Sequence, residues 1–335
     1  MRKTTVAATL LAAVGAMAIT APAWAEMREQ VLRIGTPLPD AHPISQAAKK
    51  FAELVGEKSG GKMEVKVYTG SVLGNELQMQ SALQGGTQDF SIGTTTTLAG
   101  MVREFSAIDM PYQFHTAAEA DAILDGPIGS ELFKKLEPQG LIGLAYMEQG
   151  FRHTTNSVHP ITKWEDFEGL KIRVQPSALY IDMFNGLGAN AVPMTINEVY
   201  TAMETHAIDG HENSLTAIDA NKFQEVQTYL SLTGHSYNAV VLLMGKPTFD
   251  KLNEDERKVV AEAAVEARDY QRKLTREQTA GLLVKLADEG MEVNDVTPEE
   301  KLRLAEHLKP VVEKNSQAIG AEWMATFSDA LAKLR

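Results

Sequence analysis

One stretch of the chain, residues 169–214, constrains the fold most, because strand and helix signals alternate three times within it. Residues 170–174 form a short run of alternating character rich in β-branched side chains, which predicts a strand. Pro176 ends this strand, since proline cannot donate a hydrogen bond to a central ladder. Ser177 then predicts the N-cap of a helix that Gly188 closes.

The next two alternations repeat the same order. A second strand at residues 192–194 leads into Thr195 and Glu198, which have the spacing of a capping box, and residues 207–213 form a third short strand. Three such units in succession predict a parallel, doubly wound sheet. Arg173 falls near the carboxyl end of the first strand, which is the edge where open α/β sheets bind ligands. Its planar guanidinium matches a carboxylate.

The flanking regions follow the same α/β pattern. Strands are expected at 31–36, 63–68, 89–94, 141–147 and 236–244, the last passing between two lobes. Thr94 lies at the carboxyl end of the third of these, so its hydroxyl either lines a cleft or caps the next helix. Residues 254–289 predict one helix that spans roughly 50 Å. This length exceeds the width of one lobe, so the helix either crosses both lobes or projects from them.

The first residues predict export. Arg2 and Lys3 precede an apolar run at 6–20, and Ala23-Trp24-Ala25 has the small-x-small pattern of a cleavage site. The run is shorter than the roughly 20 residues that a membrane span requires. We therefore expect residues 1–25 to be a secretory signal peptide, cleaved after about Ala25, and the protein to reside in the periplasm. The 335 residues suffice for two domains after its removal.

Composition excludes several classes of function. A net charge of −12 disfavours nucleic acids and anionic membranes as partners, so an anionic ligand needs local positive groups. Without cysteine the chain has no disulfide, thiolate zinc site or cysteine nucleophile. His211-Glu212 resembles the start of a zinc-binding helix, but Leu215 stands where the second histidine is needed. We expect no cofactor, no metal and no enzymatic activity. An exported α/β hydrolase or lyase is the alternative from a different class.

Five segments carry a resemblance to a known family. In order along the chain, at close spacing, residues 150–152, 169–174, 187–194, 198–202 and 208–213 resemble the solute-binding proteins of TRAP (tripartite ATP-independent periplasmic) transporters, of the C4-dicarboxylate-binding type. The resemblance implies a two-lobed periplasmic binding protein fold with doubly wound sheets, an interlobe cleft and a long helix spanning both lobes. The expected lobes are 26–150 with about 239–278, and 151–238 with about 279–335.

The resemblance also implies a ligand-binding site. Arg173 matches the family arginine that pairs with the solute carboxylate, and Arg152 matches a second arginine that either contacts the ligand or supports the site. Asn213 matches a strand-end asparagine that donates to the carboxylate, although His211 and Ser214 depart from the usual residues around it. Thr94, Glu148 and Tyr237, at or beside expected strand ends, complete the predicted ligand-binding set.

The implied function is capture of a small organic acid anion and its delivery to the small and large membrane subunits of a TRAP permease. A C4-dicarboxylate such as malate, succinate or fumarate is the family default. A sugar acid, either a uronate or an aldonate, stays open. A solute receptor of a signalling system or an ATP-driven importer is the runner-up role. We expect a monomer.

Overall fold

The computed structural model of the protein describes residues 27–335, so the predicted signal peptide and its cleavage site lie outside the described residues. In this part of the chain nine strands form one sheet with the order β2-β1-β3-β8-β4-β7-β5-β6, and β9 pairs with β8 off this path. The strands are β1 (Gln30–Gly35), β2 (Met63–Tyr68), β3 (Phe90–Thr94), β4 (Leu141–Asn156), β5 (Lys171–Val174), β6 (Asn190–Pro193), β7 (Gly210–Ser214), β8 (Tyr229–Gly245) and β9 (Glu292–Asp295).

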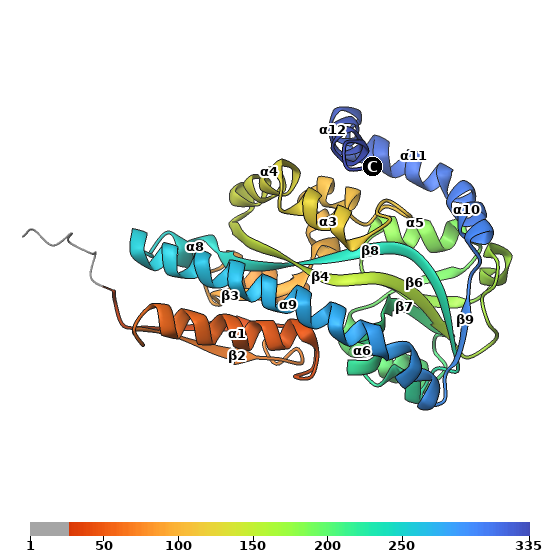
Figure 1. Cartoon of the computed structure of the whole chain (residues 1–335), viewed down its shortest axis with the longest axis horizontal. Helices are drawn as coiled ribbons and strands as arrows, with labels where there is room; N and C mark the ends of the chain where they lie inside the picture. The colour runs from red at the N-terminus through yellow and green to blue at the C-terminus, as the bar shows by residue number, and fades with distance from the viewer. Residues whose placement is uncertain (1–26) are drawn as a thin grey trace, which may run out of the picture.

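The sheet contains two parallel sets of strands, one for each lobe. In the first lobe β1 pairs in parallel with β2 and β3, and in the second lobe β5 pairs in parallel with β6 and β7. The long strands β4 and β8 pair with each other in antiparallel fashion and connect the two sets (Figure 1). The predicted two-lobed α/β fold is confirmed. The local strand–helix signals correctly indicated parallel sets, and the antiparallel strands join them into a mixed sheet.

Twelve α-helices surround the sheet in the described residues. They are α1 (Pro43–Lys58), α2 (Glu76–Gln84), α3 (Ala117–Leu124), α4 (Pro127–Leu136), α5 (Ala178–Gly186), α6 (Ile196–Glu204), α7 (Leu215–Ala220), α8 (Lys246–Phe249), α9 (Glu254–Asp288), α10 (Pro298–His307), α11 (Lys309–Ile319) and α12 (Ala321–Ala332). The capping box of Thr195 and Glu198 is present at the start of α6. Ser177 is the N-cap of α5, but its side chain makes no capping hydrogen bond.

The helices cover both faces of each lobe. In the first lobe, α1 and the first half of α9 share a core cluster with β1–β3, while α3, α4 and α12 pack on the opposite face. In the second lobe, α5, α10 and α11 cover one face, and α6, α7 and the end of α9 cover the other. The C-terminal helix α12 was expected to belong to the second lobe. Its residues Phe327 and Leu331 lie in a core cluster of the first lobe.

Helix α9 crosses both lobes, as predicted. Val260 and Ala264 are buried in the core of the first lobe, and Leu282 and Leu286 in that of the second. Figure 1 shows the helix running across both parts of the molecule. At the middle of α9 the side chain of Gln271 bonds to the backbone of β4. Within residues 27–335, α9 included, no helix combines the length and hydropathy needed to cross a bilayer.

The strands that connect the lobes are longer than the sequence predicted. The pattern indicated strands at 141–147 and 236–244, whereas β4 extends to Asn156 and β8 begins at Tyr229. Residues 148–156 of β4 are mostly polar, so the apolar pattern of the sequence did not indicate this part of the strand. Register shifts lie between Glu148 and Gly150 and between Arg152 and Thr154, at the junction of the lobes. Such bulges bend a strand and re-aim its side chains.

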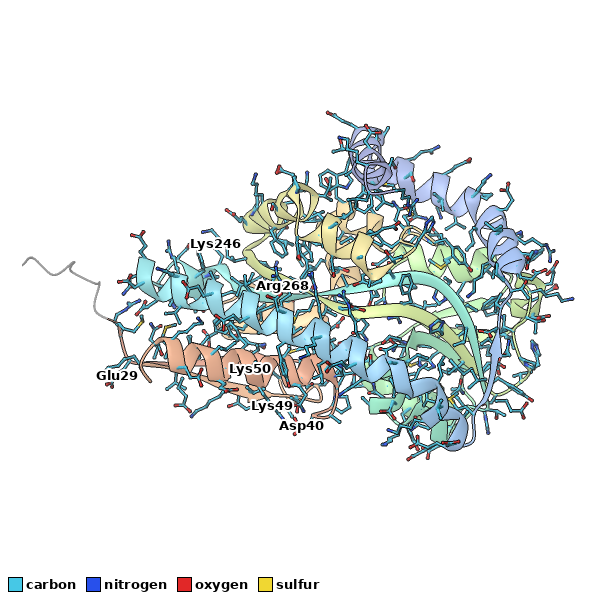
Figure 2. All side chains as sticks on the ribbon, in the orientation of Figure 1. Glu29, Asp40, Lys49, Lys50, Lys246 and Arg268 are labelled. Carbon is cyan, nitrogen blue, oxygen red and sulfur yellow. The ribbon has the colours of Figure 1, made fainter. Side chains whose placement is uncertain are left out.

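Charged side chains cover the outer surface of the helices. On and beside α1, Lys49 pairs with Asp40 at 3.1 Å (Figure 2), and Lys50 pairs with Glu53 at 3.0 Å, all partly exposed to solvent. Exposed pairs of this kind contribute about 0–1 kcal/mol to stability. The charges with larger energetic consequences are those buried between the lobes.

Candidate functional site between the lobes

A cavity lies between the lobes where strands of both parallel sets end. Its empty volume, including space open to solvent, is about 530 Å³. It lies outside the carboxyl ends of β1, β3, β5 and β7, the position at which α/β sheets bind ligands. The lining residues are Pro37, Leu38, Asn75, Glu76, Leu77, Thr94, Thr97, Gln149, Arg152, Arg173, Gln175, Pro176, Thr195, Ile196 and Asn213.

Arg173, at the end of β5, is buried in the wall of this cavity with 2% of its surface exposed. Its Nε donates to the carbonyl oxygen of Met194 at 2.8 Å, which fixes the plane of the guanidinium. Its Nη1 is buried and has no hydrogen-bond partner among the described residues. Burial lowers the pKa of Arg173 to about 10, so the group stays charged at neutral pH. A buried cation with unused donors is suited to an anionic ligand.

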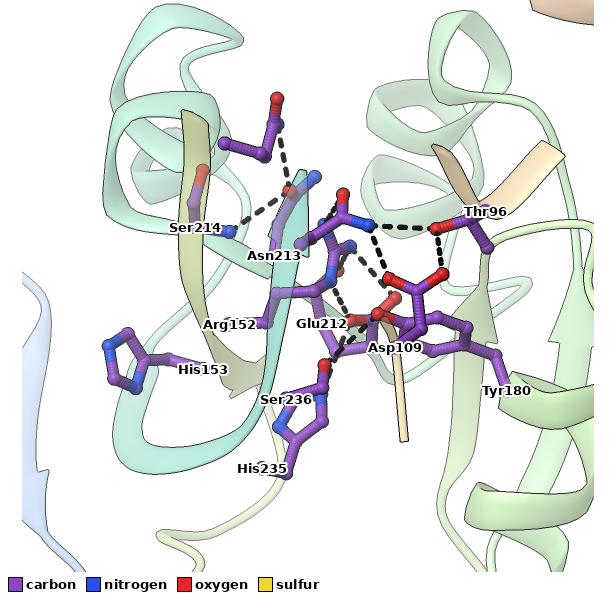
Figure 3. Close-up of polar contacts among 12 residues, drawn as sticks. Thr96, Asp109, Arg152, His153, Tyr180, Glu212, Asn213, Ser214, His235 and Ser236 are labelled. Carbon is purple, nitrogen blue, oxygen red and sulfur yellow. Dashed lines mark hydrogen bonds and ion pairs between the residues drawn. The ribbon is translucent and has the colours of Figure 1, made fainter. Parts of the chain in front are cut away.

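Arg152 lines the same cavity but is already paired. Its Nε and Nη2 donate to the two carboxylate oxygens of Glu212, and Nη2 also donates to the Glu212 carbonyl at 2.8 Å (Figure 3). Nη1 donates to Oδ1 of Asn238 at 3.3 Å. Burial opposes its charge, yet Glu212 raises the pKa of Arg152 overall. Most of its donors are therefore used inside the protein.

The Arg152–Glu212 pair belongs to a larger buried network. Oε2 of Glu212 also lies 3.3 Å from Nε2 of His235. On the first-lobe side, Asn238 donates through Nδ2 to Asp109 at 2.8 Å, and Asp109 accepts a second hydrogen bond from Thr96 at 2.8 Å (Figure 3). Burial raises the pKa of Asp109 to about 7, against the opposing effect of its two hydrogen bonds. The network connects the lobes beneath the cavity.

Two further predicted residues lie at the cavity. Oδ1 of Asn213 accepts a hydrogen bond from the backbone N–H of Ser214 at 3.0 Å, which turns the amide nitrogen away from that contact (Figure 3). Thr94 donates from its hydroxyl to Glu76 at 3.0 Å and makes no side-chain cap of the following 3-10 segment. The structure thus favours the cleft-lining role over the capping role for Thr94. Arg173, Arg152, Asn213 and Thr94 are brought together.

Glu148 and Tyr237, also predicted to bind the ligand, do not line this cavity. Glu148 precedes the bulge of β4, and its carboxylate faces α9, where it accepts from Nε of Arg276 at 2.7 Å. Tyr237 is buried in the core of the first lobe, with its ring against Phe114 and Phe151. Side chains alternate between the two faces of a strand, so a position at the junction of the lobes does not decide which face a residue occupies.

Sequence reasoning missed Glu76 and Gln175, two polar residues of the cavity wall that also contains Gln149. Glu76 begins α2 and accepts from the backbone N–H and the hydroxyl of Thr94, both at 3.0 Å. Gln149 is the extra residue of the β4 bulge, and Gln175 follows β5. Their positions in the sequence could have indicated both residues, because Glu76 begins a helix and Gln175 follows a strand. In α/β proteins such positions lie at the ligand-binding edge of the sheet.

Comparison with known proteins identifies the family. Residues 34–318 match the model of bacterial extracellular solute-binding proteins, family 7. The 2,3-diketo-L-gulonate-binding periplasmic protein YiaO of Escherichia coli K12 is 38% identical over 79% of this chain and 80% of its own. The C4-dicarboxylate-binding periplasmic protein DctP of Rhodobacter capsulatus is 31% identical over 95% of both chains.

A solved structure agrees with both the sequence match and the fold. The sugar acid binding protein DctPAm of Advenella mimigardefordensis, in complex with galactonate, superposes with a TM-score of 0.90. It is 39% identical to this protein, and the match covers 92% of this chain and 99% of the other. The chain described here therefore belongs to family 7 of the bacterial extracellular solute-binding proteins, the periplasmic binding proteins of TRAP transporters.

Proposed function

We propose that this protein captures an organic acid anion in the cavity between its lobes, with the ligand carboxylate paired to Arg173, and delivers it to a TRAP permease. The observation that carries this proposal is the buried guanidinium of Arg173, whose Nη1 has no partner within residues 27–335 although it lines a cavity. Each charge-assisted hydrogen bond to a carboxylate contributes about 1.5–3 kcal/mol. Asn213 is positioned in the same wall as a second donor group.

The family supports the wider setting of this role. TRAP solute-binding proteins are periplasmic transport proteins rather than enzymes, and their partners are the small and large permease subunits. In this protein, we propose that a leader ending at about Ala25 directs export and that the monomer presents both lobes to the permease. The lobe boundaries near residues 150 and 238 stay part of this proposal.

Two ligand classes have support among relatives. A relative from Rhodobacter capsulatus is named for C4-dicarboxylate binding, whereas one from Escherichia coli is named for a keto sugar acid and a solved relative holds galactonate. A C4-dicarboxylate such as malate, succinate or fumarate and a sugar acid both carry the carboxylate that Arg173 requires. Arginine–carboxylate capture is common to both.

A thermal-shift panel tests the proposal. A ligand at one hundred times its dissociation constant adds about 2.7 kcal/mol, which raises the melting temperature by roughly 5–10 °C. We expect such a shift with at least one organic acid among C4-dicarboxylates, uronates, aldonates and 2-oxo acids. Arg173→Lys replaces the fork with a single point charge, so we expect a tenfold or greater loss of affinity by calorimetry. Arg103→Lys, at an exposed position, is the control. Equal affinity of Arg173→Lys and the unmodified protein rejects the assignment.

A further inference from the structure

Arg173 is the cation of the cavity wall that no ion pair neutralises among the described residues. Three charged residues line the cavity: Arg152, Arg173 and Glu76. Arg152 is neutralised by its ion pair with Glu212, as described above. Glu76 holds its two oxygens on Thr94 in the first-lobe wall. Burial raises the pKa of Glu76, while the hydrogen bonds from Thr94 and the charge of Arg173 in the second lobe favour its ionised form. One ligand carboxylate at Arg173 is therefore accommodated, whereas a second carboxylate would face Glu76 without a free cation among the lining residues.

The orientation of the amide groups adds an acceptor to the cavity wall. The backbone N–H of Ser214 donates to the side-chain amide of Asn213, so the accepting atom must be Oδ1 rather than Nδ2. Gln149 meets that same oxygen at 3.5 Å, so the atom of Gln149 that faces it is the donor Nε2. Oε1 of Gln149 is left buried, without a partner in the described part of the chain. A buried acceptor of this kind is satisfied by a donor on the ligand.

Unpartnered donors gather at the end of β5, in the second lobe. Nη1 of Arg173 and Nε2 of Gln175 are both buried, and neither has a hydrogen-bond partner in residues 27–335. Both residues come from the end of β5. These donors suit the two oxygens of one carboxylate. The unpartnered Oε1 of Gln149 calls for an O–H donor, and the carboxylate of Glu76, already bonded to Thr94, can accept a further O–H. Succinate and fumarate, as dianions, carry no such O–H groups.

Resting on the proposed function, we infer that the ligand is an acid with a single carboxylate and several hydroxyls, a sugar acid rather than a C4-dicarboxylate. The carboxylate binds at Arg173, and hydroxyls along the rest of the molecule donate to Gln149 and Glu76. Glu76 is the residue that determines this specificity, because its charge repels a second carboxylate and its oxygens accept from a hydroxyl.

Calorimetry with three acids tests the inference: D-galactonate, galactarate and succinate. Galactarate differs from galactonate by a carboxylate in place of the terminal hydroxymethyl group, so the pair isolates the second charge. We expect galactonate to bind at least tenfold more tightly than galactarate or succinate. If galactarate or succinate binds as tightly as galactonate, and Arg173→Lys abolishes that binding, the inference is overturned while the proposed function stands. If none of these acids and no other member of the organic acid panel binds, both fall.

The variant Glu76→Gln tests the assigned residue. Glutamine preserves the size of the side chain and removes the charge. Its Oε1 can accept from the Thr94 N–H, while its Nε2 donates to the Thr94 hydroxyl in place of the bond that Glu76 accepts. We expect the preference for galactonate over galactarate to shrink at least threefold, chiefly through tighter binding of galactarate. Glu64→Gln, which removes an exposed carboxylate from β2 in the same lobe, is the matched control and should leave the preference unchanged. An unchanged preference in Glu76→Gln overturns the role assigned to Glu76.

Discussion

Arg152 and Glu212 form a buried ion pair between neighbouring strands, with Nη2 donating to Oε1 at 2.9 Å and only 1% and 0% of the two residues exposed. The pair holds β4 and β7 together beneath the cavity. Burial opposes ionisation of Glu212, but Arg152 and His235 lower its pKa to about 2. The second arginine of the site therefore lines the cavity with most of its donors engaged inside the protein.

Breaking this pair should destabilise the protein strongly. Arg152→Met leaves an unpaired buried carboxylate and Glu212→Gln an unpaired buried cation, so we expect each single variant to lose about 3–5 kcal/mol of unfolding free energy. The double variant removes both charges and should recover part of this loss. Urea denaturation of the four proteins gives the coupling energy. Additive losses in the double variant would contradict the pairing.

Asp109 should give stability a dependence on pH. Its pKa is raised from 3.8 to about 7, so the folded protein retains a proton that the unfolded chain releases. Stability should therefore fall as pH rises from about 4 to 7, by at most about 1.4 kcal/mol per pH unit from this one group. Asp109→Asn should lack this contribution when melting is followed across the window. The exposed Asp269→Asn should retain it, and identical profiles for all three proteins would refute the prediction.

Gln271 should contribute to stability by joining α9 to the bulge of β4. Its Oε1 accepts from the backbone N–H of Glu148 at 2.8 Å and its Nε2 donates to the Glu148 carbonyl at 2.6 Å. Gln271→Met preserves volume but leaves both buried backbone groups unpaired, so we expect a loss of about 1–3 kcal/mol per group. Lys273→Met, exposed on the same helix, should change stability by less than about 0.5 kcal/mol. Equal denaturation midpoints for the two variants would count against this role.

Gly210 should not tolerate a side chain. A Cβ at this position in β7 would lie 2.0 Å from the carbonyl oxygen of Thr155 in β4, which is backbone and cannot move aside cheaply. We expect Gly210→Ala to lower the free energy of unfolding by about 1–3 kcal/mol or more, and to lower the melting temperature. Gly281→Ala is the contrasting variant, since nothing lies within 4 Å of its Cβ in α9. Alanine there should stabilise the helix by roughly 0.5–1 kcal/mol. Similar melting of both variants would disprove the steric argument.

The sequence alone determined the local elements and the family. The capping box that begins α6, the alternation in β5 and the uninterrupted length of α9 are encoded by neighbouring residues, so their patterns predicted them. The position of Arg173 followed in the same way, because the end of a strand is a local feature and the edge of the sheet follows from it. The ordered motifs then indicated the family, which the comparisons confirm.

Only the tertiary structure decided which charges are free. Arg152 and Glu212 are sixty residues apart in sequence, and only the folded chain shows that this predicted site arginine is paired inside the protein. Glu76 joins the cavity wall from the other lobe, while the local twist and bulge of β4 turn Glu148 toward α9. Local periodicity specifies helices and strands. The partner of a buried polar group depends on long-range packing, because such a group needs a hydrogen bond and the fold decides which complementary atom lies close enough to form it.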